Sequence, residues 1–376
     1  FYLEDLKAVI ALVPQGAIAE NGEAIRAAKK CNTEVAEVHW NGTEIENRLE
    51  RDNSYRKEAA VEKLNENDIA LILHSSGTTG RPKALPLTHA NLCRTMANIQ
   101  ATYNLTIVYP PLMSGGSIIV PPRFSASEFW RDFIKHGANW YTAVPTIHQI
   151  LLRNNLPSPR PKIRFIRSCS SPLSTTAYTQ LETVMGTPVV EAYLMTEASH
   201  QMTSNPLPPL VRKSRSVGIP QGVKLQIMDD DGEALAQGQI REVCIQGVNV
   251  TSGYLGEGIA SPFTKTEYFR TGDQGFVDKD RYLTLTGRIK ELINKGGEKI
   301  SPIEIDNLFA QHPKVAETVC FAIDDELYGQ NVTVAVALEA GELYFTATMP
   351  KTATGKVQRR MVAKAMIENE KKIRDA

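Results

Sequence analysis

The sequence lacks several features that would assign it to other protein classes. No apolar run approaches the ~20 residues that span a bilayer, and the opening residues 1–6 have neither the basic start nor the apolar core of a signal peptide. Net charge is also absent, because 42 Lys and Arg residues balance 42 Asp and Glu residues. The overall charge therefore gives no indication of nucleic acid or an anionic membrane as a partner.

Cysteine is sparse, and the spacing of the cysteines does not fit a metal site or a disulfide framework. The five cysteines lie far apart without a Cys-x-x-Cys pair, which argues against a zinc site or paired disulfides. A reducing compartment is expected. The final residues 373–376 match no peroxisomal address of the Ser-Lys-Leu type.

What is present is the pattern of a soluble α/β enzyme. The 376 residues, 42% of them hydrophobic, exceed one ordinary domain and predict a large domain with a smaller one. Short apolar runs, each leading into a loop or a helical pattern, predict βα alternation and a mostly parallel sheet; they span residues 9–13, 69–73, 140–144, 163–166 and 189–193. Thr88, Thr146 and Ser174 are the predicted N-caps of helices after three of these runs.

The pattern of residue types changes twice in the second half of the sequence. Residues 218–287 read as short strands separated by turns, which predicts a β-rich subdomain. Ser301-Pro302-Ile303-Glu304 then has the pattern of a capping box that opens a helix. We therefore predict an N-terminal domain over residues 1–287 and a C-terminal α+β domain over residues 288–376.

The strongest local signal is a phosphate-binding loop directly after the apolar run 69–73. Residues 75–83 read Ser-Ser-Gly-Thr-Thr-Gly-Arg-Pro-Lys, in which glycines admit a polyphosphate, hydroxyls donate hydrogen bonds and Lys83 adds a positive charge. The spacing is not that of a Walker loop, and Ala84 stands where that motif needs Ser or Thr. Ordinary P-loop NTPase chemistry is therefore disfavoured; viewed alone, the loop also fits a surface turn.

Two further motifs place polar residues at the ends of predicted strands. Tyr193, Thr196 and Glu197 end a buried run, where open α/β sheets hold ligands. These residue types are suited to bind a purine, a phosphate and Mg²⁺ respectively. The same residues are also consistent with an ordinary strand end followed by a capping Thr. Asp273 follows a Gly turn and can accept from two ribose hydroxyls, and Arg288 can contact the same nucleotide, although Thr-Gly-Asp is also a common turn.

Two motifs near the C-terminus are further candidates for binding or catalysis. Lys295-Gly296-Gly297 offers positions without side chains for a long, thin substrate arm such as pantetheine, or forms a hairpin turn. Lys356 lies in a small-residue loop before a basic helix. It is suited to enter a site as a mobile cation, or belongs to a solvated basic tail.

In this order the motifs resemble those of the adenylate-forming superfamily of acyl-CoA synthetases. The match is nearest to the oxalyl-CoA synthetases and related peroxisomal CoA ligases of fungi and plants, through the segments at residues 140–148, 164–171 and 195–200. The resemblance implies an ATP-dependent acid:CoA ligase that forms an acyl-adenylate, releases pyrophosphate and transfers the acyl group to coenzyme A. It also implies Mg²⁺ and a location in the peroxisome matrix or cytoplasm.

Residue by residue, the resemblance implies a division of roles. Lys356, Thr196 and Glu197 would be catalytic, and Glu197 with Thr78 would hold Mg²⁺. His200 and Ser168 would contact the acid, Lys290 would be a hinge, and Lys295, Gly296 and Gly297 would line the CoA passage. The ATP and AMP contacts would come from Ser75, Ser76, Gly77, Thr78, Thr79, Lys83, Ser170, Glu191, Ala192, Tyr193, Thr196, Asp273 and Arg288.

The sequence departs from this pattern in three places. An aromatic His-Gly segment expected to line the acyl site is missing where residues 107–111 run into 112–116, and residues 341–350 are shorter than the expected connection. Arg241 stands where glycine is usual. A peptide-synthetase adenylation domain is not expected, because the given residues contain no pattern of a carrier domain.

The acid is predicted from a small number of polar residues. His200 and the polar run 168–171 predict a small polar pocket for oxalate, whereas a fatty acid would need an apolar tunnel. His200 is equally consistent with a histidine satisfied by local hydrogen bonds. Medium-chain or other fatty acids, and a nucleotide-binding module without turnover, remain alternatives; a monomer or weak dimer is expected.

Overall fold

The computed structural model divides into two compact units, residues 1–65 and 66–376. The structure describes residues 2–41, 45–49, 63–75, 82–103, 117–121, 123–256, 258–312, 314–338, 359 and 361–366. Within these residues no helix is long and apolar enough to cross a membrane. The predicted boundary between residues 287 and 288 stays a prediction.

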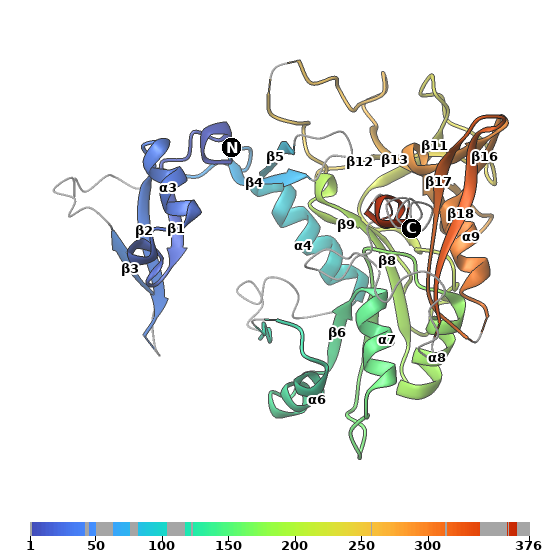
Figure 1. Ribbon diagram of the computed structural model, residues 1–376, viewed down its shortest axis with the longest axis horizontal. Coiled ribbons are helices and arrows are strands. Elements are labelled where there is room, and N and C mark those ends of the chain that lie inside the picture. The colour runs from blue at the N-terminus through green and yellow to red at the C-terminus, as the bar shows by residue number, and fades with distance from the viewer. Residues whose placement is uncertain are drawn as a thin grey trace, which may run out of the picture. The chain divides into compact units, whose positions relative to one another are not determined.

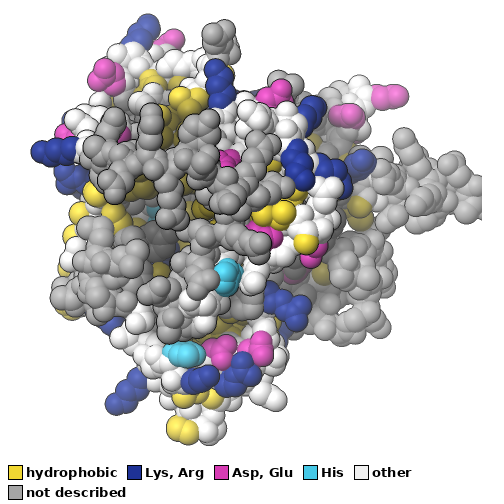
Figure 2. Space-filling view, turned by 90° about the vertical axis from the view of Figure 1, so that its left-hand side faces the viewer, with side chains coloured by type: hydrophobic (Ala, Val, Ile, Leu, Met, Phe, Trp, Pro, Cys, Tyr) yellow, Lys and Arg dark blue, Asp and Glu magenta, His cyan; other side chains and the backbone are white. Residues whose placement is uncertain are grey.

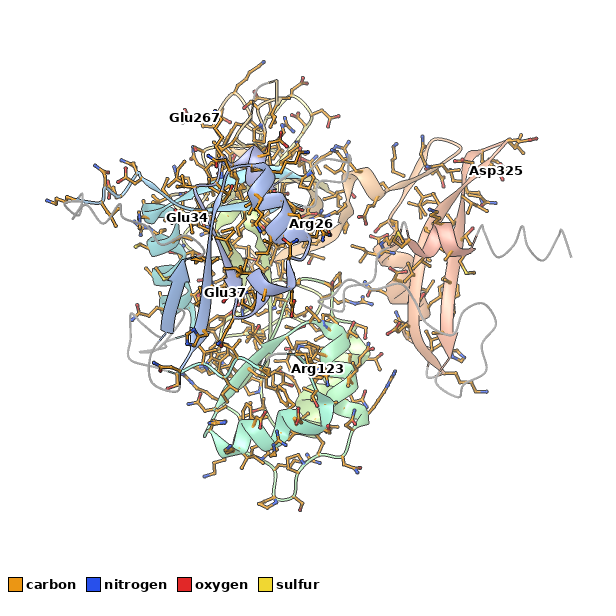
Figure 3. The ribbon with its side chains drawn as sticks, turned by 60° about the vertical axis from the view of Figure 1, so that its left-hand side comes forward. Arg26, Glu34, Glu37, Arg123, Glu267 and Asp325 are labelled. Atoms are coloured by element: carbon orange, nitrogen blue, oxygen red, sulfur yellow. The ribbon has the colours of Figure 1, made fainter. Side chains whose placement is uncertain are left out.

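The first unit is a small three-stranded sheet with helices. β1 (Ile10–Pro14) pairs in parallel with β2 (Glu34–Trp40), which pairs antiparallel with β3 (Ile45–Leu49). The helices are α1 (Tyr2–Asp5), α2 (Ala17–Glu20) and α3 (Glu23–Lys30). Ile25 and Ala28 of α3 pack with Val13 and Val35, and Glu37, labelled in Figure 3, accepts a 2.9 Å hydrogen bond from the Ile18 N–H. These contacts hold the helices on the sheet.

A five-stranded sheet organises the second unit. Its order is β10-β9-β8-β7-β6. β6 (Trp140–Ala143), β7 (Phe165–Ser168) and β8 (Val189–Met195) run parallel, whereas β9 (His200–Ser204) and β10 (Ile219–Pro220) are antiparallel. The predicted parallel sheet is therefore confirmed only for β6 to β8. The β9 strand reverses because η1 (Thr196–Ala198) turns the chain directly back without a crossover helix.

Helices cover both faces of this sheet (Figure 1). α4 (His89–Tyr103) lies against β9 on one face, where Ile99 and Tyr103 pack with Phe165 and Val190. The other face packs against α6 (Ala126–Lys135), α7 (Pro145–Arg153) and α8 (Thr175–Met185). All four residues of β7 are buried, as expected for a strand covered on both faces.

The predicted helix starts can be checked at their caps. Thr88 Oγ1 accepts from the Asn91 N–H at 3.2 Å, and Ser174 Oγ accepts from the Ala177 N–H at 3.2 Å, so both caps are confirmed. The cap predicted at Thr146 is wrong, because Val144 is the N-cap of α7. Pro145 has a backbone angle pre-set for the first helical position, so the helix begins before Thr146.

The second half of the unit consists of antiparallel sheets. β11 (Lys224–Met228), β12 (Arg241–Gln246), β13 (Phe269–Val277) and β14 (Leu283–Arg288) form one sheet in sequence order. Beside it, β4 (Ile69–Ser75) and β5 (Lys83–Thr88) form a hairpin. The strands predicted at residues 69–73 and 224–228 are confirmed.

The C-terminal part contains η2 (Ile289–Glu291), α9 (Pro302–Phe309) and a sheet ordered β16-β15-β18-β17. Its strands are β15 (Ile293–Lys295), β16 (Glu298–Ile300), β17 (Val315–Asp325) and β18 (Gly329–Leu338). Asp325, labelled at the end of the β17–β18 hairpin in Figure 3, accepts from the N–H groups of Leu327 and Tyr328 at 3.0 and 2.8 Å. Ser301 caps α9 by accepting from the Glu304 N–H at 3.3 Å, as predicted.

Charged side chains of both signs are interspersed on the surface. On the face shown in Figure 2, the described Lys and Arg side chains alternate with Asp and Glu, and neither sign gathers into one large area. This distribution agrees with the absence of net charge.

Candidate active site

The carboxyl ends of the parallel strands bring several predicted residues to one edge of the sheet. Ala143, Ser168 and Glu191 are register neighbours on β6, β7 and β8. Ser168 is 1% exposed and its Oγ has no hydrogen-bond partner among the described residues. Buried polar atoms normally have partners, so this edge, where open α/β sheets bind ligands, has unused binding capacity.

Three of the nine described non-glycine residues with positive φ lie at the same edge. Ser170, Ser199 and His200 have φ angles of 71°, 54° and 131°. Non-glycine residues in this region of φ each raise the free energy of the fold and tend to occur at ligand sites. Ser170 and His200 are both exposed there.

Three residues predicted to hold the nucleotide are in direct contact. Asp273 and Arg288 face each other across β13 and β14, and Arg288 Nε lies 2.8 Å from Asp273 Oδ1. The Tyr193 hydroxyl donates to Asp273 Oδ2. Burial first, and then the Asp273 charge, raise the pKa of Tyr193 well above its usual value of 10.0, so the hydroxyl stays protonated. Ala192, also predicted to contact the nucleotide, is buried next to Tyr193 on β8.

Thr196 and Glu197 lie in the tight turn η1, which is held by the loop after β12. Asn249 Nδ2 donates to the Ala198 carbonyl at 3.0 Å, and the Thr251 N–H donates to the Glu197 carbonyl at 2.8 Å. Ser199 Oγ donates to the Asn249 carbonyl at 2.8 Å. The backbone of Glu197 is therefore held by residues more than fifty positions away in the chain.

Tyr254 belongs to this site, although the sequence analysis did not single it out. Its hydroxyl donates to Glu197 Oε1 at 2.9 Å, and Lys83 Nζ lies 4.7 Å from the centroid of its ring. A backbone bridge between Ala84 and Leu255 holds the two segments together. No local pattern marks this tyrosine, because its partners come from distant segments; burial first, and then Glu197, raise its pKa.

The oxygen ligands described at this point fit a magnesium ion. Mg²⁺ in nucleotide sites is held by one or two carboxylates together with phosphate and water oxygens, and Glu197 supplies one carboxylate. Within the described residues, no group of three His, Cys, Asp or Glu side chains could hold a metal without such help. Thr78, the other predicted ligand, lies outside the described residues.

The phosphate loop is the connection between β4 and β5. Ser75 and Lys83 are register partners at the loop end of this hairpin, so the predicted loop joins two adjacent strand ends. Ser76, Gly77, Thr78 and Thr79 lie outside the described residues. The structure thus places Lys83 against the ring of Tyr254, whose hydroxyl contacts Glu197; a site for phosphates and a metal would need such a cation and carboxylate.

Among the described residues, the predicted C-terminal site residues make none of these contacts. Gly296 and Gly297, with φ angles of 59° and 97°, form the two-residue turn between β15 and β16, beside Lys295, and both angles suit glycine. Lys290 lies in η2. Lys356 lies outside the described residues. The roles predicted for these residues stay predictions.

The chain belongs to the AMP-binding enzyme family, whose model matches residues 1–255. It is 42% identical to an oxalate–CoA ligase of Saccharomyces cerevisiae, over 98% of this chain and 80% of that protein. An oxalate–CoA ligase of Arabidopsis thaliana is 43% identical over 83% of this chain and 70% of its own length. The resemblance proposed from the motifs is therefore confirmed.

A solved structure gives the same fold. ATP-bound MatB from Rhodopseudomonas palustris superposes with a TM-score of 0.83 at 24% identity, over 96% of this chain and 80% of that chain. The α/β fold class predicted from the sequence is therefore confirmed. At this identity the likeness concerns the fold alone.

The sequence comparison also bears on the missing segments. The alignment with the yeast protein extends over 434 positions, whereas this chain has 376 residues. The yeast protein therefore contains internal segments that this sequence lacks, in agreement with the shortened stretches at residues 107–116 and 341–350.

Proposed function

We propose that this chain is an ATP-dependent acid–CoA ligase that converts oxalate to oxalyl-CoA. The observation that carries the proposal is the identity of 42% and 43% with two oxalate–CoA ligases, the first over nearly the whole chain. The contacts among Tyr193, Asp273 and Arg288 and the group of Lys83, Tyr254 and Glu197 support a nucleotide site of the kind this reaction needs.

The reaction has two half-reactions. In the first, a carboxylate oxygen attacks the α-phosphorus of ATP, so that an acyl-adenylate forms and pyrophosphate leaves. In the second, the CoA sulfur attacks the acyl carbon, AMP leaves and the thiol proton is released. A carboxylate is a poor electrophile because its charge is delocalised; esterification with AMP removes the anion and supplies a leaving group.

The residues of this chain divide between these steps. Asp273 would accept from the ribose hydroxyls and Thr196 would contact the α-phosphate. Glu197 would hold Mg²⁺, which neutralises phosphate charge when bound. Lys356 would stabilise the charge that develops during adenylation, and a rotation near Lys290 would then bring Gly296 and Gly297 to the CoA arm.

A pyrophosphate-release assay tests the proposal. The purified protein is screened with oxalate and with short, medium and long monocarboxylates, with and without CoA. Oxalate-dependent release that yields oxalyl-CoA supports it. A preference for medium-chain acids would instead identify a fatty acyl-CoA synthetase, and no release with any acid would leave a nucleotide-binding module.

For the compartment we propose the peroxisome matrix or the cytoplasm, on the resemblance alone. A fluorescent fusion expressed in yeast beside a peroxisomal marker distinguishes the two. Fluorescence in any other compartment would contradict the proposal.

A further inference from the structure

Arg167 on β7 is a buried cation that the nucleotide site does not use. It is 4% exposed and lies on the face of the sheet that α4 covers. Its Nε donates to the Tyr103 hydroxyl at 3.0 Å, its Nη1 to Thr142 Oγ1 at 3.2 Å, and its Nη2 to Gln201 Oε1 at 2.9 Å. A longer contact of 3.8 Å joins Nη1 to the Cys169 sulfur. The guanidinium is thus held in one orientation from four elements of the chain.

Every one of these acceptors is electrically neutral. Within the part of the chain that the structure describes, no carboxylate lies within ion-pair distance of Arg167. Burying an ion without a counter-charge is unfavourable by several kcal/mol, and buried charges in proteins are as a rule paired. The arrangement therefore lacks one partner, an anion.

This guanidinium lies near a residue of the candidate acyl site, because its charge acts on the imidazole of His200. Thr142, the partner of Nη1, is itself exposed at the end of β6. Ser168 follows Arg167 on β7, so its side chain points to the opposite face of the sheet. On the face of Arg167, Ala192, two residues after the register neighbour Val190 on β8, has a small side chain.

His200 cannot supply the positive charge at neutral pH. The pKa of His200 is lowered from 6.5 to about 4. The larger cause is the loss of hydration among the surrounding atoms, and the smaller cause is the charge of Arg167. Part of the side chain is nevertheless exposed. The imidazole is therefore neutral at pH 7 and acts as a hydrogen-bonding group. The permanent charge at this end of the site belongs to Arg167.

We propose that Arg167 binds the non-reacting carboxylate of a short dicarboxylate substrate and so determines the enzyme's preference for dianions. The inference rests on the proposed function. When one carboxylate joins AMP its charge is lost, whereas the second carboxylate stays anionic through both half-reactions and needs a fixed cation. A monocarboxylate leaves Arg167 without a counter-charge and is rejected for that reason.

The test compares oxalate with glycolate, a monocarboxylate of similar size, in acid-dependent pyrophosphate exchange. Wild-type protein should favour oxalate in kcat/KM by about 100-fold, the value of a hydrogen bond to a charged group. Arg167→Gln should lose about that factor for oxalate while kcat/KM for glycolate stays within about threefold. Arg167→Lys, which keeps the charge without the planar fork, should fall between them.

A matched control and a folding check separate this role from a structural one. Arg164→Gln removes an arginine of the same segment that donates to the Tyr103 carbonyl at 2.9 Å but is exposed, and it should leave the oxalate-to-glycolate ratio unchanged. Circular dichroism and thermal unfolding verify each variant. If no Arg167 variant folds, Thr142→Asp places a carboxylate on the exposed partner of Nη1 and should lower the oxalate-to-glycolate ratio; an unchanged ratio would then overturn the inference.

The outcomes are distinguishable. An equal loss for oxalate and glycolate would mean that Arg167 only fastens α4 to the sheet, and an unchanged ratio would mean that it does not touch the acid; either overturns the inference while the proposed function stands. A wild-type ratio near one overturns it as well. No exchange with any acid overturns the proposed function and the inference together.

Discussion

Replacing Asp273 by asparagine should weaken the binding of ATP without unfolding the protein. The carboxylate is 5% exposed and already accepts from Tyr193 and from Arg288, at 2.8 Å in the second case, so it is held in place before the nucleotide arrives. Asparagine keeps one oxygen acceptor but presents an amide donor to the other ribose hydroxyl. Losing one hydrogen bond to a charged acceptor is worth about 1.5–3 kcal/mol, which corresponds to a rise of roughly 10- to 140-fold in the KM for ATP.

The assay is pyrophosphate exchange with ATP varied at saturating acid. Because the ribose stays bound after pyrophosphate has left, the thioester half-reaction from a supplied acyl-adenylate should weaken by a similar factor. Asp280→Asn is the matched control, since this carboxylate between β13 and β14 is 52% exposed and pairs with Lys213 at 2.7 Å. An exposed pair contributes about 0–1 kcal/mol to stability, so the Asp280→Asn protein should keep the wild-type KM for ATP. A folded Asp273→Asn protein with wild-type ATP kinetics would refute the assignment.

Four further expectations concern other parts of the chain. Lys356→Ala should slow adenylate formation by about 10²- to 10³-fold yet spare thioester formation from a supplied acyl-adenylate; equal loss of both half-reactions would contradict its role. Gly297→Trp should slow CoA use while pyrophosphate exchange persists, and unaltered thioester synthesis would exclude this glycine from the CoA passage. Arg359→Ala removes a 2.5 Å ion pair with Asp306 and should lower the free energy of unfolding by about 3 kcal/mol in urea titrations, because it leaves a largely buried carboxylate unpaired. Burial raises the pKa of Glu191 from 4.5 to about 8, so the folded state retains a proton that the unfolded state loses, and stability falls as pH rises between these values; Glu191→Gln should flatten the dependence of Tm on pH in that window, and an unchanged slope would be evidence against this burial.

Local sequence patterns predicted much of the fold. The strand at residues 69–75 and the helix start at Ser301 follow from an apolar run and from a cap followed by proline, and the structure has both. The cap at Thr146 was predicted wrongly, because Pro145 competes for the same helix start. The antiparallel return of β9 was also not predicted, since its direction depends on a single turn at residues 196–198.

The candidate site divides in the same way. By itself the sequence determined the kind of chemistry, because the phosphate loop and the strand-end segment at residues 193–197 are contiguous stretches whose residue types can be recognised without a structure. The tertiary structure alone decided that Tyr193 meets Asp273 across 80 positions of the chain, that Tyr254 holds Glu197, and that Arg167 is buried without a carboxylate. The physical reason is that pairing and desolvation depend on every element packed around a group, and those elements are adjacent only after the chain has folded.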